Sequence, residues 1–345
     1  MKKITAALLC VMLVISTSVT AFGATKNDVK EKIDTAVAFA FDGNYSKNGY
    51  DVSASKNLYI LAQSGADISA FATDYFKSVS DAAAAGTLTD AGVISMAVTI
   101  ADLAGADPEN INGTDLTNML KNADPGAVST PYNYFYAIEA AVNHGMKDTA
   151  AAFSNALAKY YIPGTGTDFW NGYGTSPDDL AMFILAMETA GAYTEYTKDA
   201  FEILETFATP DGYSNYGANA DSTALALAAC AAAGNTEKAD EIYDILIKNY
   251  YDPETGGFLA DYDEYYATAD AVFALRFYLP LADDAAPQES TTGNHETTTE
   301  SSSAQQNKDT GTKSPNTGIS IFPAAGAALF ALAAGGLLVK RNKNK

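Results

Sequence analysis

The chain has 345 residues and a formal net charge of −21 at pH 7. A protein this acidic repels nucleic acids and anionic lipid headgroups, so no nucleic-acid partner is predicted. The chain contains two cysteines and two histidines, which are too few for a zinc site with the usual number of ligands. No metal and no cofactor is therefore predicted.

Residues 1–24 have the pattern of a secretory signal peptide. A basic start precedes an apolar stretch over 6–15, and small residues follow it. Cleavage after Ala21 or after Gly23 fits the requirement for small residues at the cut. The mature chain keeps a single cysteine, Cys230, so no internal disulfide is predicted. Its alanine-rich surroundings indicate a small core residue.

Residues 25–280 contain a repeat in which an alanine-rich apolar helix ends in glycine. A glycine just past a helix end adopts the left-handed conformation without steric cost, so each one marks a predicted helix end. These glycines are Gly65, Gly105, Gly145, Gly191 and Gly234. The six apolar helices are predicted near 58–65, 94–105, 134–145, 180–191, 224–234 and 267–279.

More polar segments with one apolar stripe separate the apolar helices. These amphipathic helices are predicted at 27–41, 67–81, 114–122, 147–160, 195–208 and 236–250. Six such pairs predict an all-α fold. Its predicted form is an α/α toroid, with the apolar helices as an inner ring and the amphipathic helices as an outer ring. An open helical solenoid is the alternative.

Two stretches of the repeat resemble a known superfamily. One runs from Asp211-Gly212-Tyr213-Ser214 through Asn219 to Leu227, and the other from Asp252 to Phe258 and on to Asp270. Both are similar to repeats of the prenyltransferase and squalene-cyclase superfamily, whose α/α toroid the terpenoid cyclases and the corrinoid-binding transcobalamin-type proteins share. The resemblance is clearest over 170–280, and it implies the fold without implying the chemistry.

The catalytic motifs of that superfamily are absent or incomplete. Terpene cyclases use an Asp-x-Asp-Asp acid, and the nearest string here is Ser176-Pro177-Asp178-Asp179. A serine followed by Pro and two acids is typical of a helix start, so this string predicts the beginning of a helix. The sequence names no catalytic residue.

Aromatic residues gather in the loops that lead into the apolar helices. In a toroid these loops converge at one end, where Tyr and Trp beside Asp suit the binding of a sugar or another ring-bearing ligand. The alternative is that the rings close that end of the barrel and complete its core. The candidate ligand-binding residues are Trp170, Tyr173, Tyr132, Tyr213, Tyr216, Asp221, Tyr265 and Tyr266.

The C-terminal part has two further segments. Residues 281–313 are rich in Thr, Ser, Gln, Asn and Glu, which predicts a disordered spacer. Residues 314–345 begin with a short motif, continue with an apolar run over 319–339 that is long enough to cross a membrane as a helix, and end in a basic tail. The motif consists of Ser314, Pro315, Asn316, Thr317 and Gly318.

This order of motif, apolar run and basic tail resembles the cell-wall sorting signal of Gram-positive surface proteins. In such signals a sortase cuts between Thr and Gly and joins the Thr carboxyl to peptidoglycan. The resemblance implies a sortase as partner and covalent attachment through Thr317. Ser314 stands where Leu is usual, which leaves the class of sortase open.

The leading hypothesis is a wall-anchored surface protein whose toroid head is a non-enzymatic binding or adhesion module. The first alternative is a carbohydrate-active enzyme, a glycosidase or polysaccharide lyase, on the same fold. The second is a structural surface component without a small ligand. An aromatic surface favours binding, a converging pair of buried carboxylates or a Tyr–Arg pair favours an enzyme, and an interior filled by Tyr side chains favours the structural role.

Overall fold

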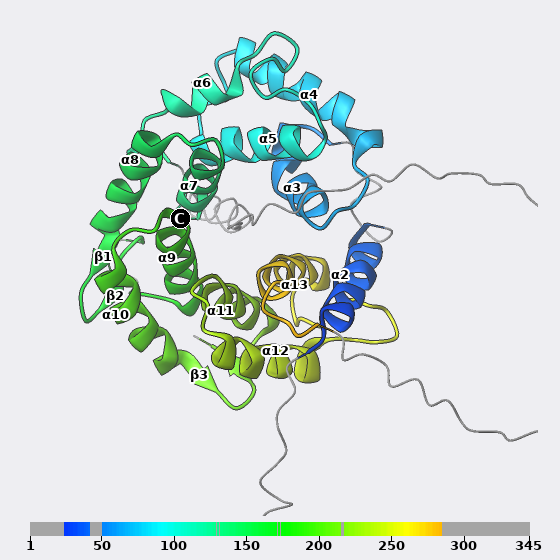
Figure 1. The fold of residues 1–345 in the computed structure, drawn as a ribbon, viewed down its shortest axis with the longest axis vertical. Coiled ribbons are helices and arrows are strands. Elements are labelled where there is room, and N and C mark those ends of the chain that lie inside the picture. Colours follow the sequence, from blue (N-terminus) through cyan, green and yellow to red (C-terminus); the bar gives the residue numbers. More distant parts are fainter. Residues whose placement is uncertain are drawn as a thin grey trace, which may run out of the picture.

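A computed structural model of the chain describes residues 24–41, 50–128, 130, 132–170, 172, 174–214 and 217–284. The predicted signal peptide up to residue 23, the spacer beyond Asp284 and the predicted sorting signal lie outside these residues. The described part is mostly helical, and each of the twelve predicted helices is present (Figure 1).

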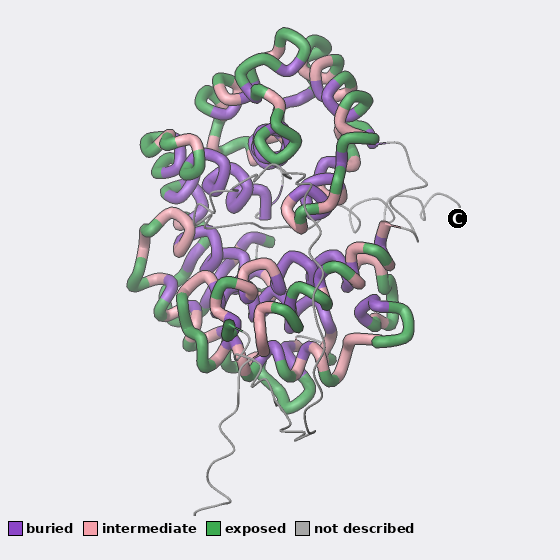
Figure 2. The backbone as a smooth tube through the Cα atoms, turned by 45° about the vertical axis from the view of Figure 1, so that its right-hand side comes forward, coloured by how far each residue is buried: buried purple, intermediate pink, exposed green. Residues whose placement is uncertain are grey.

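Six of the helices correspond to the predicted apolar helices and form an inner layer. They are α3 (Ser55–Gln63), α5 (Ala91–Leu103), α7 (Asn133–Asn143), α9 (Pro177–Ala190), α11 (Ala220–Ala232) and α13 (Glu264–Tyr278). Most residues of these helices are buried, whereas exposed residues gather in the outer loops (Figure 2). Cys230 on α11 is a buried free thiol, as its alanine-rich surroundings predict.

The other six helices flank the inner layer on its outer side (Figure 1). They are α2 (Lys26–Ala40), α4 (Ser69–Ala84), α6 (Leu116–Lys121), α8 (Lys147–Leu157), α10 (Thr194–Leu204) and α12 (Thr236–Tyr250). Each of α6, α8, α10 and α12 packs against the inner helix that precedes or follows it, and α2 packs against α13. Their buried residues recur every three or four positions, as on α12, where Ala239, Ile242 and Leu246 are buried.

Contacts among the inner helices follow the order of the chain. Each inner helix packs against the next, from α3 through α5, α7, α9 and α11 to α13. The last inner helix, α13, also contacts the first, α3. The five predicted helix-ending glycines all adopt positive φ values, between 60° and 82°. Each of them therefore ends an inner helix as predicted.

Five of the six inner helices begin about one turn before the apolar runs that predicted them, and α7 begins one residue before its run. On α5, α9, α11 and α13 the side chain of the residue before the helix caps the first turn. On α9, the Ser176 hydroxyl accepts a hydrogen bond from the Asp179 backbone N–H at 3.0 Å, and Pro177 is the first helical residue. This confirms the predicted helix start at Ser176-Pro177-Asp178-Asp179.

Short pieces of other structure occur between the α-helices. Two small antiparallel hairpins, β1 with β2 and β3 with β4, each follow a 3₁₀ turn at the end of an outer helix. The predicted outer helices at 147–160 and 195–208 therefore end earlier than expected. These elements are η2 (Val52–Ala54), η3 (Ala158–Tyr160), β1 (Tyr161–Ile162), β2 (Gly166–Thr167), η4 (Glu205–Phe207), β3 (Ala208–Thr209) and β4 (Gly212–Tyr213).

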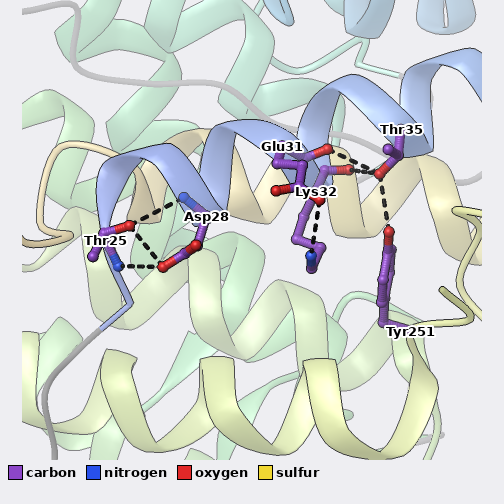
Figure 3. Close-up of polar contacts among 6 residues, drawn as sticks. All are labelled: Thr25, Asp28, Glu31, Lys32, Thr35 and Tyr251. Carbon is purple, nitrogen blue, oxygen red and sulfur yellow. Dashed lines mark hydrogen bonds and ion pairs between the residues drawn. The ribbon is translucent and has the colours of Figure 1, made fainter. Parts of the chain in front are cut away.

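The first helix, α2, is fixed at its start and along its length (Figure 3). Thr25 caps it through a reciprocal capping box with Asp28. Farther along, the Thr35 hydroxyl lies 3.1 Å from the hydroxyl of Tyr251, which follows α12, and the Lys32 Nζ lies 4.9 Å from the centre of the Tyr251 ring. These contacts join the first helix of the described chain to a segment more than 200 residues later.

The two ends of the described chain lie together. The Lys26 N–H donates to the carbonyl of Asp283 at 2.8 Å, and the Asp283 N–H donates to the carbonyl of Ala24 at 3.0 Å. The Lys26 Nζ also forms an ion pair with Asp284 at 2.7 Å. The folded part thus extends past residue 280 to Asp284, into the segment that the sequence assigns to the spacer.

Candidate functional site

Four aspartates at the same end of neighbouring inner helices form the group called here the acid cluster: Asp178, Asp179, Asp221 and Asp270. Asp178 and Asp179 lie in the first turn of α9, and Asp221 lies in the first turn of α11, which Asn219 caps. Asp270 lies on the second turn of α13. Asp179, Asp221 and Asp270 are buried, with exposed fractions of 2%, 4% and 1%.

The carboxyl groups of the acid cluster are hard to ionise. Burial raises the pKa of Asp178 to about 6, and the charge of Asp179 adds to the rise while a hydrogen bond from Ser222 opposes it. Burial also raises the pKa of Asp221 to about 7, with a further contribution from the charge of Asp178. The pKa of Asp270 lies well above its usual range for the same two reasons, burial first and then the charges of Asp221 and Asp178. The helices that carry these carboxyl groups pack side by side, α9 on α11 and α11 on α13.

One lysine faces the acid cluster. Lys56 lies in the first turn of α3, and its Nζ lies 4.3 Å from the centre of the Tyr266 ring. Burial lowers the pKa of Lys56 well below its usual value, although the charges of Asp270 and Asp221 favour the protonated form. The larger effect is burial, so Lys56 loses its proton more readily than an exposed lysine does.

Three oxygens of the acid cluster are buried and have no hydrogen-bond partner in the described part of the chain. They are Asp178 Oδ1, Asp221 Oδ1 and Asp270 Oδ1. Leaving a buried polar atom unsatisfied costs about 1–3 kcal/mol, and more when the group is charged. Such atoms are rare in folded proteins and gather where a ligand binds or a reaction occurs.

Two exposed aromatic rings are hydrogen-bonded to the acid cluster. The Trp170 Nε1–H and the Tyr132 hydroxyl both donate to Asp179 Oδ1, at 3.3 Å and 3.1 Å. The Tyr262 hydroxyl donates to Asp221 Oδ2. Trp170 is 40% exposed and Tyr262 is 62% exposed. The site therefore combines buried carboxyl groups with aromatic rings that reach the surface.

Four of the predicted ligand-binding residues come together at this site. They are Trp170, Tyr132, Asp221 and Tyr266. Tyr266 belongs here because its ring lies under the Lys56 Nζ, and its ring centre lies 6.0 Å from that of Tyr262. Of the other four, Tyr213 and Tyr265 lie elsewhere, and Tyr173 and Tyr216 are outside the described residues.

Tyr213 lies elsewhere, because its hydroxyl donates to Glu205 at 2.7 Å beneath the outer layer. Tyr265 stacks on Phe39 of α2, with ring centres 5.1 Å apart. Tyr173 and Tyr216 lie outside the described residues, as does the motif at 314–318.

Sequence reasoning missed Lys56 and Asp270 as site residues, and it interpreted Asp178 and Asp179 only as a helix start. Tyr262 belonged to the loop aromatics of the predicted surface without being singled out as a candidate. Helical spacing carried a signal for Asp270. Tyr262, Tyr266 and Asp270 are four residues apart in turn, so those on α13 share one face of the helix. Lys56 had no such signal, because it reaches the site from a helix more than 100 residues away in sequence.

A second buried polar group lies deeper in the inner layer and is called here the Tyr–Glu pair. The Tyr59 hydroxyl on α3 donates to Glu139 Oε2 on α7 at 2.6 Å, and Gln63 donates to the same hydroxyl at 3.2 Å. Burial raises the pKa of Glu139 to about 8, although the charge of Arg276 on α13 and the hydrogen bond from Tyr59 oppose the rise. The pair links inner helices that are not neighbours in the order of the chain.

The described residues do not bring three His, Cys, Asp or Glu side chains together in a way that could hold a metal ion. None of the helices in the same part of the chain is both long and apolar enough to cross a membrane. No family model matches the chain, and no curated protein or solved structure matches it either.

Proposed function

We propose that the protein is exported and joined to a Gram-positive cell wall, and that its helical head is an α/α toroid. The order of contacts among the inner helices supports the toroid, because α13 returns to α3. The residues around Thr317, with the apolar run and basic tail that follow them, support attachment by a sortase. The wall peptidoglycan is then the covalent partner.

The head binds a glycan or another hydroxylated, ring-bearing ligand at the acid cluster. One observation carries this proposal: the exposed rings of Trp170 and Tyr262 are hydrogen-bonded to the buried carboxyl groups of Asp179 and Asp221. Sugars are bound by rings that stack on their faces and by polar groups that bond their hydroxyls, and both kinds of group meet here.

Replacing Trp170 by alanine tests the binding surface. We expect Trp170→Ala to weaken glycan binding roughly tenfold, because a stacked ring contributes about 1–1.5 kcal/mol. The change should cost less stability than the about 3–5 kcal/mol lost with a fully buried Trp, since this ring is 40% exposed. Titration of the wild type with a glycan panel, followed by the intrinsic fluorescence of the single tryptophan, identifies the ligand.

Phe169→Ala is the matched control for this test. Phe169 is only 8% exposed and packs on Tyr160, with ring centres 5.1 Å apart. Its loss should lower stability more than the loss of Trp170 while leaving the exposed ring in place. If Trp170→Ala destabilises the head as much as Phe169→Ala and leaves binding intact, the ring is a structural plug and the structural role is favoured.

A second candidate function is hydrolysis of a glycan at the same site. The carboxyls of the acid cluster favour it, because the pKa of Asp178, about 6, and that of Asp221, about 7, lie near neutrality. A general acid that protonates a glycosidic oxygen needs a pKa raised in this way. Release of reducing ends from the bound glycan, lost in Asp178→Asn with binding retained, would establish hydrolysis. Bound glycan that stays intact over many hours would leave binding as the function.

Wall attachment is tested at the motif itself. Thr317→Ala should give an exported protein that is not joined to peptidoglycan, because a sortase cuts after this threonine in the signals that the motif resembles. Muramidase digestion, followed by mass analysis of attached wall fragments, measures the linkage. Ser314→Leu restores the usual pentapeptide and should stay attached. Identical wall fragments on the Thr317→Ala variant and the wild type would refute attachment by a sortase.

A further inference from the structure

The acid cluster carries more carboxyl groups than opposing charges. Four aspartates lie in it, and within the described residues the cation whose charge acts on Asp221 and Asp270 is Lys56. Lys56 is itself held over the Tyr266 ring. When the carboxyls ionise, the site therefore has an excess of negative charge in a buried setting, where electrostatic interactions are strong.

The carboxyl groups of the acid cluster differ in whether the protein satisfies their oxygens. Asp179 accepts hydrogen bonds from Trp170 and Tyr132, so its carboxylate is satisfied by the protein. Asp221 and Asp270 are more than nine-tenths buried, and each has an Oδ1 atom without a hydrogen-bond partner in the described part of the chain. A ligand that supplies donors to these two oxygens would remove the cost of leaving them unsatisfied.

We propose, on the basis of the glycan binding proposed above, that the ligand of the acid cluster carries a protonated primary amine, as an amino sugar with a free amine does. An ammonium group supplies three hydrogen-bond donors and the charge that the cluster lacks. Aromatic faces, here that of the exposed Trp170, also attract ammonium groups. A neutral hydroxyl would supply donors but leave the charge unbalanced. A divalent metal would need a set of converging ligands that the described residues do not form.

Two sugars that differ only at the nitrogen test this inference. We expect the full-length protein, purified in detergent, to bind a hexamer of glucosamine at least tenfold more tightly than a hexamer of N-acetylglucosamine, measured by calorimetry at pH 6.5. Because the pKa of Asp221 is about 7 in the free protein, binding of the ammonium group at this pH should release protons from the acid cluster, and calorimetry in buffers of different ionisation heat measures that release. Acetylation removes the positive charge and keeps the sugar ring. The preference should shrink as salt is added, because salt screens charge interactions.

Substitutions in the acid cluster show whether the preference arises there. Asp221→Asn and Asp270→Asn each remove a carboxyl that can ionise when an ammonium group binds, with little change of shape, so each should reduce the preference to about threefold or less. Glu139→Gln is the matched control, because it removes a buried carboxyl from the Tyr–Glu pair and should leave the preference unchanged. The ratio of two affinities on one variant is insensitive to a partial loss of folded protein, since both affinities fall together.

The possible outcomes are distinct. A tenfold preference that Asp221→Asn and Asp270→Asn abolish supports an amine-binding site. Equal affinity for both hexamers overturns the amine inference and leaves glycan binding standing. A preference that survives both substitutions also overturns it, because the amine is then attracted to the acidic surface in general. Binding of neither hexamer, nor of any glycan in the panel, overturns the proposed function as well.

Discussion

Buried carboxyl groups occur at two places in the described part of the inner layer, the acid cluster and the Tyr–Glu pair. The Tyr59 hydroxyl and the Glu139 carboxyl are both buried, and their hydrogen bond joins α3 to α7. Tyr136 packs edge-on against Tyr59, with ring centres 5.3 Å apart. A buried carboxyl of this kind stabilises the fold only in the protonation state that its surroundings favour.

Glu139 should make the stability of the head depend on pH. Its folded-state pKa is about 8, against a usual value of 4.5, so the folded protein holds this proton over a range in which the unfolded chain releases it. The free energy of unfolding should therefore be highest below about pH 4.5 and fall as the pH rises to about 8. Each unit of pKa shift corresponds to about 1.4 kcal/mol, which is the largest slope that one group can give.

Glu139→Gln removes this dependence because an amide does not titrate, while Tyr59 can still donate to the amide oxygen. Chemical denaturation between pH 5 and 9 should show a flatter profile for the variant than for the wild type. Glu202→Gln makes the same substitution at an exposed site on α10 and should leave the wild-type profile unchanged. Parallel profiles for Glu139→Gln and the wild type would contradict the raised pKa.

Part of the site could be predicted from the sequence, and helix geometry explains the rest. Trp170 and Tyr132 were found because they lie in loops that converge at one end. Tyr265 and Tyr266 are neighbours in sequence, but successive helical residues point about 100° apart, so one packs on Phe39 and the other faces the acid cluster. Assigning these residues to a loop therefore does not predict which of the two side chains faces the acid cluster.

At the scale of elements, the inner helices approach one another closely because their residues are small. Gly92 lies in the first turn of α5, and a Cβ added there would overlap the Cβ of Asn133 on α7 and lie 2.9 Å from its Cα. The same glycine costs helix stability, since glycine is a poor helix former. Its presence is therefore explained by the packing of α5 on α7.

Gly92→Ala should destabilise the head by about 1–3 kcal/mol, because overlap with a backbone atom forces the two helices apart. This is opposite in sign to the gain of about 1 kcal/mol that alanine normally gives within a helix. Gly105→Ala, past the other end of α5, meets nothing within 4 Å and should cost only the strain of a left-handed backbone, about 1–2 kcal/mol. Thermal unfolding measures the loss of stability in each variant, and a crystal structure of each measures the distance between α5 and α7. The distance should grow in Gly92→Ala, where the helices overlap, and stay the same in Gly105→Ala, where only the backbone is strained. An unchanged distance in Gly92→Ala would contradict the packing argument.

The elements themselves were predictable where the repeat was regular. All twelve helices followed from apolar runs, apolar stripes and terminal glycines. The two hairpins did not, because strands of two residues have no periodicity to detect. The start of α9 was predictable from a different signal: Ser176, Pro177 and the two acids are typical of a helix start, although the apolar run begins a turn later.

At the scale of the whole molecule, hydrogen bonds join the first described residues to the last ones, and this contact is called here the closure. Asp283→Pro removes the N–H that donates to the carbonyl of Ala24 and should loosen the start of α2. We expect a loss of about 1–2 kcal/mol, the cost of one hydrogen bond and of an unsatisfied carbonyl, and faster hydrogen exchange in the first turn of α2. Asp283→Ala keeps the N–H and should exchange like the wild type. Equal exchange in both variants would mean that the closure does not hold α2.

The same closure sets the path of mechanical load. Tension from a wall attachment would enter the head at Asp284, and a ligand held at the acid cluster would oppose it. The first contacts to be sheared are then the hydrogen bonds of Asp283 with Ala24 and Lys26, which lie next to the point of entry. In the proposed wall-anchored form the load would pass only through the C-terminal side, so α2 would detach under force while the inner helices stay packed, and the closure would break before the ligand site does.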